Sequence, residues 1–111
     1  MLARKKHEPS FKIWIEYGGK PVIGRGGAAI LEQIKNEKSI SKAAKKLNMS
    51  YRYVWNYLKR IERTFGEPIV ETYRGGEHGG GGATLTKLGE NLLNEYKRLE
   101  HHFNRVLSEM E

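Results

Sequence analysis

Four polar side chains that can recognise nucleic acid recur on one side of the segment 50–65. At 100° per residue, a helix over this segment brings together Arg52, Asn56, Lys59 and Arg63. An Arg side chain can bind guanine O6 and N7 through two hydrogen bonds, and an Asn side chain can bind adenine N6 and N7. We therefore expect Arg52 and Asn56 to contact bases, and Lys59 and Arg63 to hold phosphates.

The opposite side of this helix is apolar, because it carries Val54, Leu58 and Ile61. A helix face that is merely solvated usually mixes both charge signs, whereas the four-residue polar stripe contains no acid. The pattern therefore favours DNA as the partner of the stripe. Ser50 precedes the helix and can cap its first turn, and we include it among the residues at the interface.

Four aromatic residues interrupt the stripe. Tyr51 and Tyr53 lie at the start of the helix, where they could contact the DNA backbone or thymine methyl groups. Packing on neighbouring helices is an equally good interpretation of both. Trp55 and Tyr57 flank the apolar side, so we expect them to be structural.

The composition is that of a small, basic, soluble protein with one domain. The 111 residues include 20 Lys and Arg against 13 acids, all of them Glu, so the net charge is +7. Residues 1–63 hold 15 of the cations and 5 of the acids, which concentrates the positive charge in the half that contains the stripe. Such a balance favours a polyanionic partner. Residues 1–10 form a basic arm that we expect to be flexible. No long apolar run follows it, so it predicts neither a signal peptide nor a membrane anchor.

Residue types that most catalytic sites need are missing. The chain has no Cys and no Asp, which excludes disulfides, thiolate sites and Asp-based catalytic triads. Adjacent His101 and His102 would point about 100° apart on a helix and could not share a metal ion. Gly24, Gly26 and Ala29 match the spelling of a phosphate-binding loop, but no strand with a terminal acid follows about 20 residues later. We expect no enzyme activity, no metal and no cofactor.

Two short helices joined by a tight turn are predicted to carry the stripe. Ser39 or Ser41 can cap the first helix, which buries Ile40, Ala43, Ala44 and Leu47. Asn48 and Met49 form the turn, and the second helix runs from Ser50 to Phe65, where Gly66 and Pro68 end it. This arrangement is typical of a helix-turn-helix.

A hairpin and a further helix precede this unit. Apolar and polar residues alternate over 11–17, which predicts a half-buried strand, and Gly18 and Gly19 turn the chain into a second strand at 21–23. The glycine-rich step 24–27 begins a helix that should end near Glu37. We expect the fold class to be α+β and mainly helical.

A glycine-rich hairpin is predicted to follow the helix over 50–65. The segment 69–74 resembles a strand, residues 75–82 contain six glycines, and 83–85 resembles a second strand. Directly after a helix-turn-helix, these elements indicate a wing over 74–84, although a plain flexible hairpin has the same pattern. Glycines let the backbone pass close to phosphates, and Arg74 would supply the charged contact.

The last element is a helix of about 25 residues that begins after Thr86. Apolar residues recur at spacings of 4, 3, 4, 3 and 4, which is the seam of a coiled coil. They are Leu92, Tyr96, Leu99, Phe103, Val106 and Met110. So small a chain has little core with which to cover this face, so the seam predicts a homodimer. A long helix that caps its own chain is the alternative.

Three stretches of the chain together match the pattern of one family of regulators. They are GRGGAAILEQI, SISKAAKKLNMSYRYVW and FGEPIVETYRGGEHGGGGATLTKLGENLLNEY. These residues resemble the N-terminal DNA-binding domain of the molybdate-responsive transcription regulators (ModE family), which is distantly similar to LysR-type regulators. The likeness covers roughly residues 11–100. It implies a winged helix-turn-helix homodimer that controls transcription, with the helix that begins at Ser50 in the major groove.

Two departures limit what the resemblance implies. Glu77 and His78 occupy the wing tip, where the family often has a basic residue. The sequence also ends after the last helix, so we expect no oxyanion-binding domain and no direct response to molybdate. A separate sensor protein or the abundance of the chain itself would then control its activity.

The sequence therefore predicts an arm over 1–10, a winged helix-turn-helix over 11–85 and a dimerisation helix over 86–111. Its predicted function is that of a cytoplasmic, nucleoid-associated regulator that binds specific double-stranded DNA sequences as a homodimer. A protein that coats DNA without sequence preference is the main alternative. A module whose coil pairs with a different chain is another. Asn56 and Arg52 favour sequence readout over coating, because binding of phosphates alone needs only cations.

Overall fold

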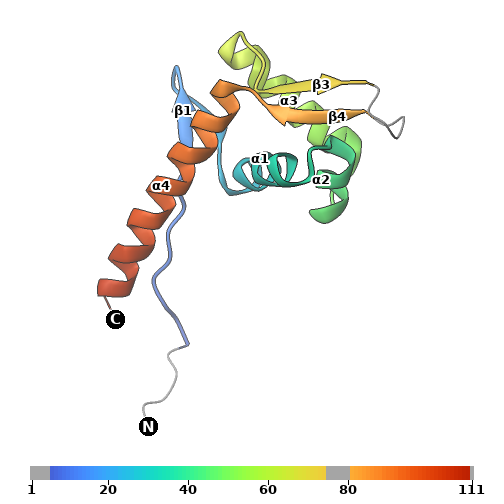
Figure 1. The fold of residues 1–111 in the computed structure, drawn as a ribbon. Helices are drawn as coiled ribbons and strands as arrows, with labels where there is room; N and C mark the ends of the chain where they lie inside the picture. Colours follow the sequence, from blue (N-terminus) through green and yellow to red (C-terminus); the bar gives the residue numbers. More distant parts are fainter. Residues whose placement is uncertain (1–5, 75–80, 111) are drawn as a thin grey trace.

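A hairpin, three helices, a second hairpin and a long helix follow one another along the described part of the chain (Figure 1). The structure, a computed structural model, describes residues 6–74 and 81–110. The elements are β1 (Ile15–Tyr17), β2 (Lys20–Ile23), α1 (Arg25–Glu37), α2 (Ile40–Lys46), α3 (Tyr51–Phe65), β3 (Val70–Tyr73), β4 (Gly82–Leu85) and α4 (Lys87–Glu109). The predicted fold class, a mainly helical winged helix-turn-helix with an N-terminal hairpin, is confirmed.

The N-terminal hairpin forms as predicted, but its first strand is shorter. Gly18 and Gly19 have φ values of 58° and 81°, which suit a glycine turn, and β1 pairs with β2 in antiparallel register. Residues 11–14 have no pairing strand and leave the sheet. They run beside α4 (Figure 1), where the ring of Phe11 lies 5.6 Å from that of Phe103. The alternation of apolar and polar residues over 11–17 favours an extended chain, but a strand forms only where a partner strand lies beside it.

The helix-turn-helix has the caps that the sequence predicts. Ser39 Oγ accepts a hydrogen bond from Lys42 N at 3.1 Å, and Ser50 Oγ accepts one from Tyr53 N at 3.0 Å. At the end of α3, Gly66 adopts the left-handed conformation with φ 78°. The caps satisfy backbone groups that the helix ends would otherwise leave unpaired.

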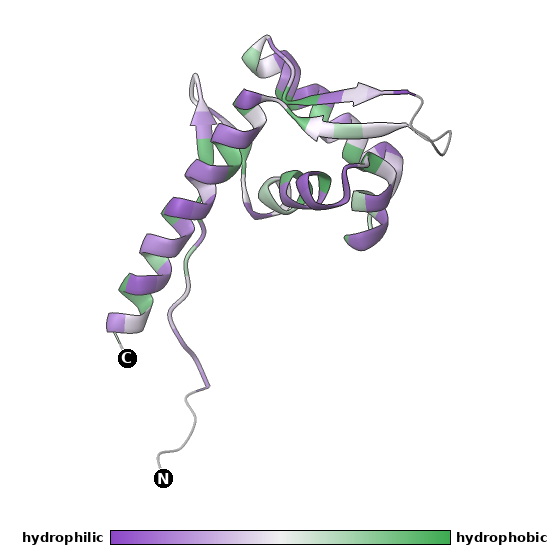
Figure 2. Cartoon of the chain, viewed as in Figure 1, coloured by the Kyte–Doolittle hydropathy of each residue, from purple (hydrophilic) through white to green (hydrophobic). Residues whose placement is uncertain are grey.

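A single apolar core lies where the helices meet the bases of the two hairpins (Figure 2). α1 contributes Ile30, Leu31 and Ile34, and α3 contributes Val54, Leu58 and Ile61, all of which are almost fully buried. Tyr57 joins α3 to the N-terminal hairpin, because its hydroxyl donates to Val22 O at 2.8 Å. Burial raises the pKa of Tyr57 above its usual range, so the phenol keeps the proton that it donates.

The wing is attached to the core at its base. β3 and β4 pair in antiparallel register from Val70 and Leu85 outward. Ala83 N donates to Lys38 O at 2.9 Å, which connects the wing to the end of α1. Thr86 Oγ1 donates to Pro68 O at 2.9 Å and accepts from Gly89 N at 3.2 Å, so one side chain closes the hairpin and caps α4.

The two halves of α4 have different surroundings. Leu92, Leu93 and Tyr96 belong to the core formed by α1 and α3. Beyond them the helix leaves the globular body (Figure 1). At about 1.5 Å per residue the 23 residues of α4 extend roughly 35 Å. The predicted boundary between the winged helix-turn-helix over 11–85 and the dimerisation helix over 86–111 therefore falls where the chain is still part of the same core.

Candidate nucleic-acid interface

The outer face of α3 exposes most of the polar stripe. Arg52, Asn56 and Arg63 are exposed, while the apolar side of the same helix is buried. Because α3 is capped at both ends and packed along its whole length, these side chains project from a rigid element. Rigid presentation favours base readout, since little conformational freedom is lost on binding.

Lys59 has closer protein partners than the sequence suggested. Its Nζ lies 3.1 Å from Glu62 Oε1 and 4.4 Å from the centre of the Trp55 ring. The polar stripe is therefore not free of acid at this end, because Glu62 lies three residues further along the same helix. A phosphate would have to draw Lys59 away from both contacts.

Glu62 connects the recognition helix to the wing. Its Oε2 accepts hydrogen bonds from Ile69 N at 2.9 Å and Val70 N at 3.3 Å, and only 13% of its side chain is exposed. These backbone groups lie at the start of β3. The sequence alone does not reveal this role, because the only local signal is the spacing of Lys59 and Glu62.

The aromatic residues of α3 divide into two groups. Tyr51 and Tyr53 are 50% and 58% exposed, so about half of each side chain faces solvent. Tyr51 stacks on Trp55 within α3, with 6.2 Å between ring centres and 14° between planes. Tyr57 has the structural role predicted for it. Trp55 is half-buried and packs against the core, but it also lines a surface groove.

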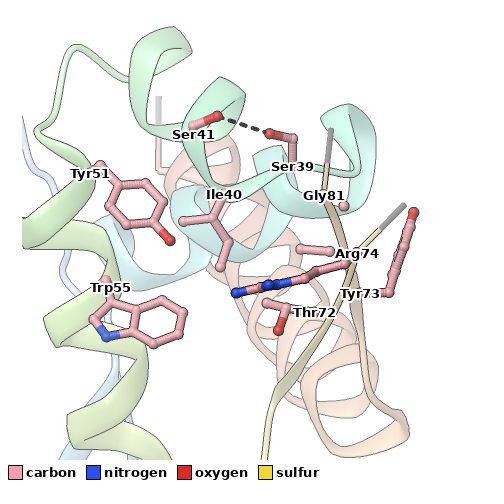
Figure 3. Close-up of a pocket in the computed structure, with 11 residues that line it drawn as sticks. Ser39, Ile40, Ser41, Tyr51, Trp55, Thr72, Tyr73, Arg74 and Gly81 are labelled. Carbon is pink, nitrogen blue, oxygen red and sulfur yellow. Dashed lines mark hydrogen bonds between the residues drawn. The ribbon is translucent and has the colours of Figure 1, made fainter. Parts of the chain in front are cut away.

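A groove of about 550 Å³ separates the start of α3 from the wing (Figure 3). We call it the wing groove. Its walls come from the starts of α2 and α3 and from the facing parts of β3 and β4. The lining residues are Ser39, Ile40, Ser41, Tyr51, Trp55, Thr72, Tyr73, Arg74, Gly81, Gly82 and Ala83. Of these, the sequence predicts an interface role for Tyr51 and, through the wing over 74–84, for Arg74 and residues 81–83.

Arg74 lies on the wing, at the end of β3, and its side chain is exposed. Figure 3 shows its guanidinium extending from the wing across the groove toward Trp55. Glu77 and His78 lie outside the described residues. At the outer end of the paired strands, a Cβ on Gly82 would meet the ring of its cross-strand partner Tyr73, which is half exposed and would have to shift.

α2 adds cations that the sequence analysis did not assign. Lys42, Lys45 and Lys46 are exposed along this short helix. In helix-turn-helix proteins, the helix before the recognition helix crosses the DNA backbone. A run of three lysines on such a helix was a readable signal for phosphate contacts.

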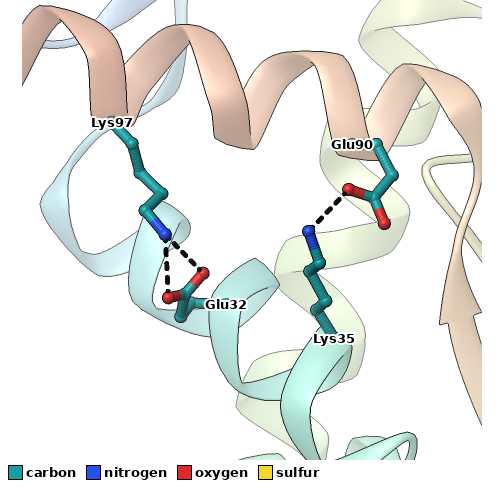
Figure 4. Close-up of polar contacts among 4 residues, drawn as sticks. All are labelled: Glu32, Lys35, Glu90 and Lys97. Carbon is teal, nitrogen blue, oxygen red and sulfur yellow. Dashed lines mark hydrogen bonds and ion pairs between the residues drawn. The ribbon is translucent and has the colours of Figure 1, made fainter.

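The seam of α4 is split between core and surface. Leu92 and Tyr96 are 7% and 3% exposed, so their own chain covers them and no partner can reach them. Their assignment to a dimer surface is corrected here: α1 packs on this part of the helix. Two ion pairs flank the contact, Lys35 with Glu90 at 3.0 Å and Lys97 with Glu32 at 3.1 Å (Figure 4).

The remaining seam residues are exposed, and we call them the distal face. They are Leu99, Phe103, Val106 and Met110, of which Val106 is 51% and Met110 65% exposed. Phe11 covers part of the Phe103 ring. In the described part of the chain, no helix is both long and apolar enough to cross a membrane.

Comparison with known proteins identifies a family and several relatives. Residues 28–90 match the model of the bacterial regulatory helix-turn-helix proteins of the lysR family. The molybdenum-pterin-binding protein MopB of Rhodobacter capsulatus is 34% identical over 89 residues, covering 80% of this chain and 33% of that protein. The transcriptional regulator ModE of Yersinia pestis is 41% identical over 71 residues, covering 64% of this chain and 27% of that protein. The chain thus spans a third or less of these relatives, and the predicted resemblance to ModE regulators is confirmed.

Two solved structures share the fold. The crystal structure of ArgP from Mycobacterium tuberculosis has a TM-score of 0.56 at 23% identity, covering 75% of this chain and 29% of that chain. The crystal structure of the BenM DBD/catB site 1 DNA complex has a TM-score of 0.55 at 19% identity, covering 75% of this chain and 86% of that chain. At these identities the likeness concerns the fold alone.

Proposed function

Since this chain belongs to the lysR family of bacterial regulatory helix-turn-helix proteins, we propose that it is a transcription regulator that binds specific DNA sequences as a homodimer. α3 enters the major groove, and the wing contacts the neighbouring backbone. The relatives named ModE support a regulatory role. A cytoplasmic location at the nucleoid is part of the same proposal.

The exposed polar stripe on α3 is the observation that carries the proposal. Arg52 and Asn56 lie one turn apart on the outer face, so they can reach neighbouring base pairs in the major groove. Asn56 matters most for specificity, because it is uncharged and adds nothing to the general attraction between the protein and the DNA backbone. The lysines of α2 and Arg63 supply that attraction.

Substitution of Asn56 separates base readout from charge. A specific duplex is first selected from a random pool, and its affinity is compared with that of random duplex DNA at one salt concentration. Asn56→Ala should weaken the specific complex by about 1–3 kcal/mol and leave random binding nearly unchanged. Arg52→Ala should weaken the specific complex at least as much, while Arg63→Ala should weaken both complexes by a similar factor.

The alternative is a protein that coats DNA without reading it. It predicts that no preferred duplex emerges from the selection, or that Asn56→Ala changes specific and random affinities by the same ratio. Either result would contradict sequence-specific regulation and support a protein that coats DNA. Arg98→Ala is the control for these measurements, because it removes one exposed cation from α4, away from α3 and the wing.

The distal face of α4 supports the homodimer. Four apolar residues at spacings of 4, 3 and 4 remain exposed where the helix leaves the body, with part of the Phe103 ring covered by Phe11. A copy of the same helix has the complementary pattern, and an antiparallel or crossed pair would bury both faces. A two-fold dimer also presents two recognition helices to half-sites about 34 Å apart, one turn of DNA.

Sedimentation of two charge variants tests this dimer. Leu99→Glu places a carboxylate in the distal face and should yield monomers, because a buried unpaired charge is unfavourable by several kcal/mol. Asn94→Glu adds the same charge to the polar side of α4 and should remain dimeric. A dimer mass for Leu99→Glu would contradict this interface, and Trp14, which is exposed on the N-terminal segment, would mark the next surface to test.

A further inference from the structure

The wing groove combines one cation with several neutral hydrogen-bond donors. Arg74 extends into it from the wing, and the hydroxyls of Ser39, Ser41 and Tyr51 lie on the opposite walls (Figure 3). The Ser39 and Ser41 hydroxyls are 3.2 Å apart. No residue that the structure places in the lining is acidic. Such a set of groups favours an anion, because guanidinium and hydroxyl groups can all donate to its oxygens.

The charge of the groove matches a singly charged ligand. Arg74 is its one cationic lining residue among the described residues. A phosphodiester carries one negative charge and offers two free oxygens, so one guanidinium and one or two hydroxyls satisfy it. A doubly charged oxyanion would remain partly uncompensated.

The position of the groove indicates which phosphodiester it holds. On the proposed function, α3 lies in the major groove and the wing reaches the adjoining backbone. The DNA strand that borders the major groove must then pass between α3 and the wing. The wing groove is the space between these two elements. The partly buried Trp55 lines the same space with apolar surface, against which a deoxyribose ring can pack.

We propose that the wing groove clamps one phosphodiester of the DNA backbone in each half-site, with Arg74, Ser41 and Tyr51 donating to its oxygens. Ser39 acts differently, because its oxygen already accepts from Lys42 N and its hydroxyl lies against Ser41. It positions the Ser41 hydroxyl. Trp55, on which Tyr51 stacks, orients the Tyr51 ring. This inference rests on the proposed function and adds a specific backbone contact to it.

Neutral linkages in the DNA test the clamp. A duplex selected for binding is prepared as a series in which one phosphodiester at a time is replaced by an uncharged methylphosphonate. The full-length wild-type chain should lose roughly tenfold in affinity at one linkage per half-site that lies between the α3 and wing contacts. In Arg74→Ala the loss at that linkage should shrink to less than about twofold, because the contact is already absent.

A salt titration of Arg74→Ala and two further variants sharpen the result. Arg74→Ala should reduce the slope of log affinity against log salt by about one unit per half-site. Ser41→Ala should diminish the response at the same linkage and at no other, with Arg74 still present. Arg98→Ala removes an equal charge from α4 and should leave the response of every linkage unchanged.

The outcomes separate the clamp from the function on which it rests. If Arg74→Ala responds to every neutral linkage as the wild type does, the clamp is refuted while sequence-specific binding stands. If the wild-type chain binds no duplex, the proposed function fails and the clamp fails with it. Loss of the response in Arg98→Ala would show that general charge, and no particular phosphate, controls the measurement, which also overturns the clamp.

Discussion

Replacement of Glu62 by Ala should loosen the attachment of the wing to the recognition helix. In the wild type, this carboxylate accepts from Ile69 N and Val70 N and pairs with Lys59. Ile69 is 0% exposed and Val70 is 7% exposed. Truncation at Glu62 therefore leaves two backbone N–H groups without this acceptor at a site that bulk water reaches poorly.

The expected loss follows from these contacts. A hydrogen bond to a charged acceptor contributes about 1.5–3 kcal/mol, and the bond of 3.3 Å to Val70 N lies beyond the usual distance range. Because 13% of the Glu62 side chain is exposed, water can partly replace the lost carboxylate as an acceptor. Together these considerations give a loss of about 2–3 kcal/mol in the free energy of unfolding. For a chain of this length that corresponds to a fall of roughly 8–12 °C in Tm.

Thermal and urea unfolding at one fixed chain concentration measure this effect, since dimerisation makes apparent stability depend on concentration. Glu67→Ala is the matched control, because it removes the same charge from an exposed position just after α3. It should change stability by less than about 0.5 kcal/mol. Lys59→Gln removes the partly exposed ion pair and the contact with the Trp55 ring, and it should cost about 1 kcal/mol.

The reasoning would be refuted if Glu62→Ala and Glu67→Ala had the same stability. The N–H groups of β3 would then have found other acceptors. Glu62→Gln gives an intermediate case, because its amide oxygen can keep one bond. Hydrogen exchange at the amides of Ile69 and Val70 provides a local readout, and it should accelerate in Glu62→Ala more than exchange in the α1 core does.

Three other predictions test the packing that supports the interface. Gly27→Ala should destabilise the fold by about 1–3 kcal/mol, because the added Cβ would displace the Tyr57 hydroxyl from its hydrogen bond to the N-terminal hairpin. Gly26→Ala is the control, because its Cβ meets open space. It should be neutral or stabilising in the same unfolding assay. Thr86→Ala should lower stability by about 1–2 kcal/mol, since it removes both the α4 cap and the bond that closes the wing, and unchanged unfolding would mean that neither contributes. Leu93→Ala should lose about 2–5 kcal/mol while sedimentation still shows a dimer, and a monomer would place this residue at the interface.

Local patterns in the sequence were sufficient for the helix-turn-helix. Ser50 and Gly66 mark the ends of α3 as predicted, because capping depends on residues within a few positions of the helix end. The apolar side of α3 was also correct, since a period of 3.6 residues assigns faces from sequence alone. The strands of the wing followed from turn chemistry and alternation.

Contacts between distant segments required the tertiary structure. The role of Glu62 depends on β3, seven residues away, folding back against α3. The wing groove draws its walls from α2, α3 and both strands of the wing, and no local pattern contains all of them. Residues in such a site share a place in space and not a spacing along the chain.

The seam of α4 shows where the limit lies. The sequence determined that one face of this helix is apolar over its whole length, because helical periodicity is a local property. Helical periodicity does not determine which segment packs against that face. Only the packing of α1 against the first half of α4 decided that Leu92 and Tyr96 belong to the core of their own chain, while Val106 and Met110 remain exposed.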